Sequence, residues 1–224
     1  MILVYPYSDL CTWENNELRY SIRSFCKFID IKRVIVVGFK PDWYKGEHIP
    51  FPDGKRKERN IFEKVCEAAK VCEKFIFAND DHFMLQPDPI DYYYSRPLFA
   101  KCSDDWYGKQ CRNTYELFPD GMFFDIHYPM IIESDKIPTQ YDWYKKEYVF
   151  KSLYCNHNKI EGVYRGDCKI PGYLAYDRIT EFAGQFSFMS LGTEALTKEM
   201  RKWLVERFTE PSPFELQNIS VGLQ

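Results

Sequence analysis

The sequence predicts an α/β fold in which helices flank a sheet, and three observations support this class. An apolar run opens the chain at residues 1–7 and stops at Pro6, as expected for a core strand followed by a loop. A β-branched run at 33–38 is typical of a strand buried on both faces of a parallel sheet. Between them, apolar residues repeat at helical spacing from Leu18 to Ile29. Strand, helix and strand in this order predict a βαβ unit with a right-handed crossover.

Length and composition narrow the possibilities further. The 224 residues suit one domain spanning 1–224, and no internal repeat or linker divides them. A formal net charge of -3 provides no broad basic surface, which disfavours a function resting on nucleic-acid affinity. No apolar run approaches the ~20 residues that span a bilayer, so a soluble protein is expected. The eight cysteines contain no C-x-x-C, and with no signal peptide they favour reduced thiols in the cytoplasm.

The rest of the chain is organised around residues 74–83. Four apolar residues run into Asn79, Asp80, Asp81 and His82, which places an acidic pair at the carboxyl end of a short buried strand. Buried unpaired charges cost several kcal/mol, so this pair must be solvated, hydrogen-bonded or bound to a cation. Strand ends bind ligands in open α/β sheets, and Mg²⁺ or Mn²⁺ bridges carboxylates to phosphates. A metal-diphosphate site and a simple turn cap explain this segment equally well.

Two basic features precede that strand. Arg19 and Arg23 lie one helical turn apart, so they are either solvated separately or share an anion. Residues 55–59 place several cations at the start of a helix predicted over 58–72, where the macrodipole disfavours positive charge. An anionic ligand would relieve this, although a solvated basic turn is equally consistent. The candidates for contact with a diphosphate here are Arg56, Arg59 and Asn60.

The second half of the chain is predicted as shorter elements. They are a turn and strand at 91–100, an irregular or hairpin insertion over the site at 101–121, an interrupted apolar stretch at 122–132, a helix at 141–155, a polar loop at 162–171 and a helix at 193–208. His127 is either a core histidine bonded to the backbone or a further metal ligand beside the aspartates. Lys169 or Arg165 could neutralise a leaving diphosphate. The conceivable catalytic bases are Asp125, Asp167 and Glu181, and the sequence does not choose among them.

Three strings carry a family resemblance: NELRYSIRS at 16–24, FANDDHF at 77–83 and HYP at 127–129. Together with PSPFE at 211–215, they resemble GT-A-fold glycosyltransferases, and more narrowly the small phage and bacterial transferases related to the Stealth family of sugar-1-phosphate transferases. By this resemblance Asp80 and Asp81 stand for the family's Asp-x-Asp metal motif, with Asn79 in place of its first aspartate. The resemblance implies a GT-A-like, Rossmann-like single domain with a mixed sheet.

The resemblance also implies a set of site residues. The metal, Mn²⁺ or Mg²⁺, would be held by Asp81, Asp80 and His127. The nucleotide-sugar donor, for which a UDP-sugar is favoured, would contact Tyr7, Asn16, Arg19, Arg23, Arg56, Asn60 and Asn79. The catalytic candidates are Asp80, Asp125 and Asp167. The cation would stabilise charge on the departing diphosphate while the protein aligns the acceptor hydroxyl.

The acceptor is left open by the sequence. It is a glycan, a lipid-linked or small molecule, or else a hydroxymethylated DNA base, which an enzyme would have to flip into a pocket. A non-catalytic module that binds nucleotide-sugars or glycans is the third alternative. Since the chain lacks the long Stealth architecture, we expect transfer of a sugar rather than of a sugar phosphate. A phage-encoded protein in the host cytoplasm is one option that the resemblance raises.

Overall fold

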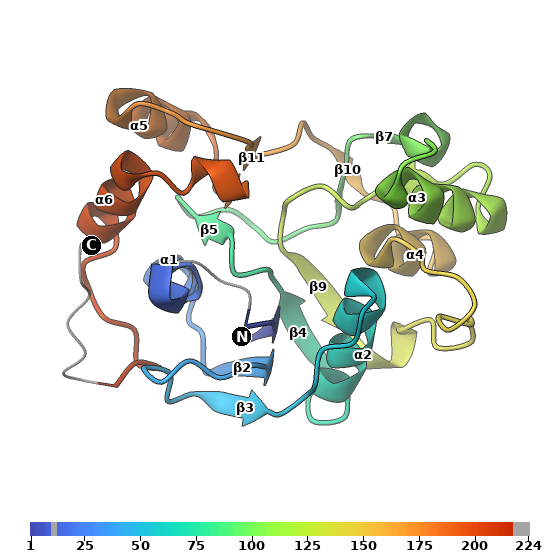
Figure 1. The fold of residues 1–224 in the computed structure, drawn as a ribbon, viewed down its shortest axis with the longest axis horizontal. Coiled ribbons are helices and arrows are strands. Elements are labelled where there is room, and N and C mark those ends of the chain that lie inside the picture. The colour runs from blue at the N-terminus through green and yellow to red at the C-terminus, as the bar shows by residue number, and fades with distance from the viewer. Residues whose placement is uncertain (10–12, 217–224) are drawn as a thin grey trace.

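The computed structural model describes residues 1–9 and 13–216, and its central sheet has the strand order β3-β2-β1-β4-β9 (Figure 1). The strands are β1 (Ile2–Tyr7), β2 (Arg33–Gly38), β3 (Glu47–Ile49), β4 (Lys74–Phe77) and β9 (Met130–Glu133). The first four are parallel, and β9 pairs antiparallel with β4. The predicted α/β class with a mixed sheet is confirmed.

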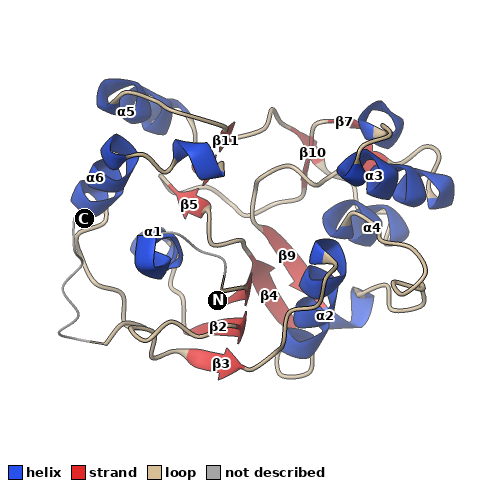
Figure 2. Ribbon diagram, in the orientation of Figure 1, coloured by secondary structure: helices blue, strands red, loops and turns tan. Residues whose placement is uncertain are grey.

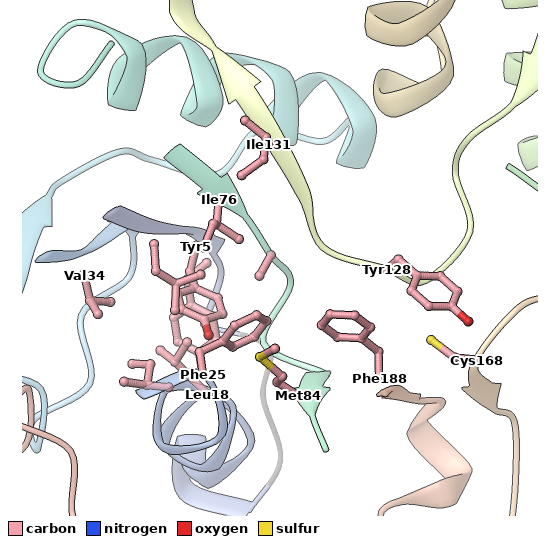
Figure 3. Packing of buried hydrophobic residues seen from close by; sticks show 14 of the residues in the cluster. Tyr5, Leu18, Phe25, Val34, Ile76, Met84, Tyr128, Ile131, Cys168 and Phe188 are labelled. Atoms are coloured by element: carbon pink, nitrogen blue, oxygen red, sulfur yellow. The ribbon is translucent and has the colours of Figure 1, made fainter. Parts of the chain in front are cut away.

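Strand β1 lies in the middle of this sheet, and its alternating side chains build two cores. Leu3 and Tyr5 pack with Leu18 and Phe25 of helix α1 (Asn16–Phe28), as Figure 3 shows for Tyr5, Leu18 and Phe25. Val4 points to the opposite face, which is covered by α2 (Lys57–Ala69) and α4 (Phe150–His157). Helices on both faces explain why the strands read as continuous apolar runs.

A second sheet of strand order β11-β12-β5 adjoins the end of β4. Its strands are β5 (His82–Met84), β11 (Lys169–Ile170) and β12 (Phe188–Leu191), and β12 runs antiparallel to β5. Helices α5 (Tyr176–Gln185) and α6 (Lys198–Arg207) pack on it through a separate apolar cluster (Figure 2). This sheet brings residues near 190 beside the acidic pair that follows β4.

The remaining elements lie at the periphery. They are α3 (Trp106–Leu117), the antiparallel pair β7 (Arg96–Pro97) and β8 (Met122–Phe123), the parallel pair β6 (Tyr93–Tyr94) and β10 (Val163–Tyr164), and short 3-10 helices at 13–15, 98–101, 134–136 and 193–195. Within the described ranges, no helix has both the length and the apolar character needed to cross a membrane.

Several predicted boundaries were wrong. The first strand continues through Pro6 to Tyr7, because β4 pairs only with Leu3 and Val4, so no ladder bond to β4 is lost at Pro6. Strand β3 was not predicted from the sequence. It escaped notice because only three residues form it. Part of the loop predicted after β1, residues 10–12, lies outside the described residues.

Two helix predictions also need correction. Residues 101–121 contain α3 rather than an irregular insertion, and the Asp105 carboxylate caps it by accepting from the backbone N–H groups of Tyr107 and Gly108, both at 2.9 Å. The helix predicted over 141–155 begins only at Phe150. Before it, Asp142 accepts from the N–H groups of Tyr144 and Lys145, which stabilises a turn instead.

Candidate functional site

A cavity of about 520 Å³ opens at the carboxyl ends of β1 and β4. We call it the strand-end cavity. Its lining includes Tyr7 of β1, residues 79–81 after β4, Glu17 of α1, four positions of α2 or its approach (Lys55, Lys57, Asn60 and Lys64), His127, Lys169 and residues 191–193. The structure therefore brings Tyr7, Asn60, Asn79, Asp80, Asp81 and His127 together, as the sequence predicted.

Four carboxyl groups line the same cavity, and one of them, Asp53, pairs with Lys64 at 2.6 Å. The other three belong to Asp80, Asp81 and Glu17, and the Asp81 Oδ2 accepts a 2.6 Å hydrogen bond from Ser190 Oγ of β12. Burial, followed by the nearby charges of Asp80 and Asp81, raises the pKa of Glu17 to about 8. Such mutual repulsion would be relieved by a bound cation. Glu17 was missed as a site residue although it lies in the NELRYSIRS string, because a helix-start glutamate is also an ordinary first-turn residue.

A tight turn presents the acidic pair. The His82 N–H donates to the Asn79 carbonyl at 3.1 Å, and the Asn79 N–H donates to His82 Nδ1 at 3.3 Å. Burial lowers the pKa of His82 well below its ordinary value, so the ring is neutral and can accept this bond. The predicted turn exists, but backbone groups and His82 close it. The Asp81 side chain accepts from the Ser190 hydroxyl, and its backbone carbonyl accepts from the Leu191 N–H at 3.2 Å.

The cavity lining also contains a buried lysine, Lys64, that the sequence analysis did not find. Lys64 is 1% exposed, and its ammonium donates to the Tyr7 carbonyl and Asp53 Oδ1, both at 2.6 Å, and to Ser8 Oγ at 3.1 Å. Its partners fix the end of β1 and the segment before α2. The sequence did indicate that Lys64 is buried, because it falls three residues after Ile61 and next to Val65 on the apolar side of the predicted helix.

Replacing Lys64 by methionine is expected to destabilise the fold by roughly 1–3 kcal/mol, because it leaves buried acceptors without their donor. Donor affinity should fall as well, since Tyr7 and the segment at 53–55 lose their common anchor. Urea unfolding and titration with UDP would measure the two effects. Lys70→Met, on an exposed position of the α2 C-cap, is the matched control. Equal stability of the two variants would contradict the structural role of Lys64.

His127 is held by Asp167. The imidazole Nδ1 lies 2.9 Å from Asp167 Oδ2, and since a carboxylate only accepts, Nδ1 carries the proton. Nε2 is left as an acceptor and lies 3.2 Å from the Lys169 ammonium. Burial alone would raise the pKa of Asp167, but hydrogen bonds from His127 and its charge outweigh burial and lower it to about 2. Asp167 thus orients His127, and its role as catalytic base stays a prediction.

Arg19 and Arg23 share an anion, as one alternative predicted, but the anion is the chain's own Glu215. Arg23 binds it through two hydrogen bonds of 2.8 and 2.6 Å, and Arg19 Nε lies 3.6 Å from the same carboxylate. All three side chains are buried, and within the described part of the chain neither arginine lines the strand-end cavity. Their predicted contact with the donor is therefore corrected. Glu215 belongs to the PSPFE string, whose role here is to close this pair.

Two further predicted residues lie elsewhere. Asp125 accepts from the Ser152 N–H at 2.8 Å and its hydroxyl at 2.6 Å, so it caps the first turn of α4 and does not act in the described cavity as a base. Arg56 donates to the Tyr144 carbonyl at 3.0 Å and points away from the strand-end cavity. Its prediction failed because adjacent residues at a helix start face different directions.

The other candidates have structural partners. Asn60 holds Gly54 through both of its amide atoms, and Asn16 is buried at the start of α1 outside the described lining of the cavity. Arg59 pairs with Glu63 at 2.9 Å, Arg165 pairs with Asp88 at 3.2 Å, and Glu181 pairs with Arg178 at 2.5 Å on the surface of α5. The Tyr7 hydroxyl donates to Asn15 Oδ1 at 2.6 Å, which leaves its ring at the cavity wall.

Glu58, in the first turn of α2, is buried. Burial, then the charges of Asp125 and Glu147, raises its pKa to about 8 from an ordinary value of 4.5. The folded state therefore keeps a proton that the unfolded chain releases, so this contribution to stability is complete below pH 4.5 and is lost as the pH rises through about 8.

We expect the free energy of unfolding to decline across this window and Glu58→Gln to flatten the decline. Urea unfolding at several pH values measures this, with half-buried Glu67→Gln as control. An unchanged slope in Glu58→Gln would contradict it.

The chemistry of the cavity fits a hard divalent cation that shares its ligands with a substrate. Among the described residues, no group of three or more His, Cys, Asp and Glu side chains forms a metal-binding arrangement. The carboxylates of Asp80 and Asp81, with Glu17 beside them, offer the oxygen ligands that Mg²⁺ and Mn²⁺ prefer. A cation of this kind commonly takes one or two carboxylates and completes its shell with phosphate oxygens and water. His127 Nε2 is the nitrogen available on the opposite side.

No protein-family model and no curated protein matches this chain. Its fold is similar to solved glycosyltransferases. One is involved in glycosylation of the major capsid of PBCV-1, at 12% identity and a TM-score of 0.39, covering 93% of this chain and 97% of that one. Another is the galactosyltransferase LgtC, at 12% identity and 0.44, covering 93% and 94%. A third is GlyE of Streptococcus pneumoniae, at 8% identity and 0.44, covering 93% and 60%. Likenesses this distant carry no inference about activity, so membership of the GT-A and Stealth groups stays a prediction.

Proposed function

We propose that this chain is a glycosyltransferase that uses Mn²⁺ or Mg²⁺ and a nucleotide-sugar, with a UDP-sugar favoured, and transfers the sugar to a hydroxyl acceptor. The observation that carries the proposal is the strand-end cavity itself. Its lining combines the carboxyl groups of Asp80, Asp81 and Glu17 with the ammonium groups of Lys55, Lys57 and Lys169. A metal-bound diphosphate matches both sets of side chains. The metal takes carboxylate oxygens as ligands, and the phosphate oxygens bind the lysine ammonium groups.

Each residue then has a definite task. Asp81 and Asp80 would hold the cation, which when bound supplies Lewis-acid stabilisation of the departing diphosphate. Ser190 orients Asp81 through its 2.6 Å hydrogen bond. Lys55, Lys57 and Lys169 neutralise phosphate charge that develops as the sugar leaves. Tyr7 lines the cavity at the end of β1.

His127 is the group best arranged to handle the acceptor proton or to complete the ligand shell. Asp167 fixes its tautomer, so Nε2 faces the cavity as a lone pair. The Lys169 ammonium lies 3.2 Å from Nε2 and can donate a hydrogen bond to it. An imidazole oriented in this way serves either as a ligand or as a proton acceptor.

A UDP-release assay tests the proposal. The chain is incubated with several UDP-sugars, with and without Mn²⁺, and with oligosaccharide, lipid-linked or hydroxymethylated DNA acceptors. We expect UDP release that depends on Mn²⁺ and rises with one acceptor class. If the chain binds UDP but releases no UDP from any UDP-sugar under these conditions, the proposed activity is contradicted and a binding module is supported instead.

A further inference from the structure

A second cavity, of about 410 Å³, lies against the start of α2 on the side opposite the strand-end cavity. We call it the α3 cavity. Its lining is formed by Arg56, by Trp106, Lys109, Gln110 and Asn113 of α3, and by residues 145–147 before α4. Nothing in the proposed donor chemistry uses these residues.

Unpaired polar atoms distinguish this cavity from an ordinary surface hollow. Gln110 is 3% exposed, and neither its amide nitrogen nor its amide oxygen has a hydrogen-bond partner among the described residues. The Glu147 Oε1 is likewise buried and unpaired in the described chain. Buried amides and carboxylates are nearly always bonded, and an unmet bond costs about 1–3 kcal/mol. The cavity thus presents one donor and two acceptors, which is the complement of hydroxyl groups that both donate and accept.

An aromatic face and positive charge complete the lining. Trp106 is 54% exposed, whereas the other four tryptophans are buried, so a flat apolar surface is held open at this cavity. Lys145 and Lys146 pair with Asp142 and Glu116, but Lys109 forms no ion pair with any described residue. The cavity therefore offers an aromatic ring for stacking, polar atoms that can bond hydroxyl groups, and a lysine without an ion-pair partner among the described residues. These features match a sugar that carries an acidic group.

The two cavities are close together along the chain. Lys55 and Lys57 line the strand-end cavity, while Arg56 between them lines the α3 cavity. Neighbouring Cα atoms are about 3.8 Å apart, so the linings of the two cavities come within one residue of each other at this segment. A saccharide seated in the α3 cavity is within reach of the strand-end cavity if it extends past Arg56.

We propose that the α3 cavity is an acceptor subsite that binds a saccharide bearing a phosphate or carboxylate group, a role that rests on the proposed donor function of the strand-end cavity. Trp106 stacks on the sugar ring, Gln110 and Glu147 bond its hydroxyls, and Lys109 with Arg56 binds the acidic group. An extended nucleic-acid backbone is disfavoured, because the basic residues surround one hollow and the chain as a whole carries a net charge of -3.

The first test measures binding without donor. Acrylamide quenching of tryptophan fluorescence reports on Trp106, since the other four indoles are buried. Glucose 6-phosphate and glucuronate are expected to protect this fluorescence, and glucose to do so at least about tenfold more weakly, the scale of one charge-assisted hydrogen bond. Comparison of the two acidic sugars distinguishes phosphate from carboxylate. Trp106→Phe should abolish the signal, and Lys109→Gln should remove the preference for acidic sugars. Equal protection by glucose, or stronger protection by a hydroxymethylated oligonucleotide, overturns the proposal.

The second test separates this inference from the donor function. With a UDP-sugar and Mn²⁺, Lys109→Gln should raise the KM for an acidic acceptor roughly tenfold and leave acceptor-independent UDP release unchanged. If sugars bind at Trp106 but no UDP is released, the donor function fails and the subsite stands. If UDP is released and Lys109→Gln leaves the KM of every acidic acceptor unchanged, the subsite fails and the donor function stands. Circular dichroism of each variant verifies folding.

Discussion

Replacing Asp81 by alanine is expected to lower metal-dependent UDP release by at least about 100-fold, the scale seen when one charge-stabilising group is removed from an active site. Asp81 lies at the carboxyl end of β4, lines the strand-end cavity and is oriented by Ser190. Without its carboxylate, Asp80 would be the remaining carboxylate of the acidic pair. The loss should appear in kcat and in the concentration of Mn²⁺ needed for half-maximal rate.

Two control variants make this result interpretable. Asp104→Ala removes an exposed carboxylate just before α3. Asp104 is not part of the described lining of the strand-end cavity, so turnover should be unchanged. Ser190→Ala keeps the Asp81 carboxylate but frees it, and should give a smaller loss than Asp81→Ala. Metal-dependent turnover that survives in Asp81→Ala would refute the metal role of this residue.

Replacing Arg23 by methionine is expected to reduce the free energy of unfolding by about 3–5 kcal/mol, because it leaves Glu215 as a buried charge without its bidentate partner. Side-chain exposures of 8% for Arg23 and 5% for Glu215 mean that water cannot substitute for the lost bonds. Chemical denaturation monitored by circular dichroism measures the change. The affinity for UDP should be unaffected, since Arg23 is absent from the described lining of the cavity.

The double variant Arg23→Met, Glu215→Gln provides the matched comparison. It also removes the carboxylate 3.6 Å from Arg19, so that buried guanidinium loses its anion, while the glutamine oxygen can still accept from the Ser212 N–H, which Glu215 binds at 2.8 Å. We expect it to be less stable than Arg23→Met, in which Arg19 and Glu215 still pair. If Arg23→Met weakened UDP binding at unchanged stability, Arg23 would be a donor contact after all, as the sequence interpretation held.

Local sequence was enough to predict the centre of the fold. The apolar runs that form β1, β2 and β4 need no partner to be recognised, because strands buried on both faces contain few polar residues. Helices α1 and α2 are likewise visible from spacing alone. Strand β3 and the two-residue strands were missed, because so short a segment carries no period to detect.

The position of the acidic pair was also predictable. Asp80 and Asp81 follow a core strand directly, so the chain itself places them at the edge where β1 also ends. The contributions of Tyr7, Asn60 and His127 to the cavity followed from the same reasoning or from the family resemblance. Glu17 and Lys64 carried weaker signals, since their residue types are common on the solvated faces of helices.

The sequence by itself determined that this is an α/β protein whose chemistry centres on residues 79–81, because strand burial and strand ends are local properties of the chain. Only the tertiary structure decided which distant charge each polar residue meets. Arg23 pairs with Glu215, Asp167 with His127, and Asp125 with the start of α4, across separations of 192, 40 and 27 residues. Arginine and aspartate bind a protein partner and a ligand with the same hydrogen bonds, so residue type alone cannot distinguish a structural ion pair from a binding site.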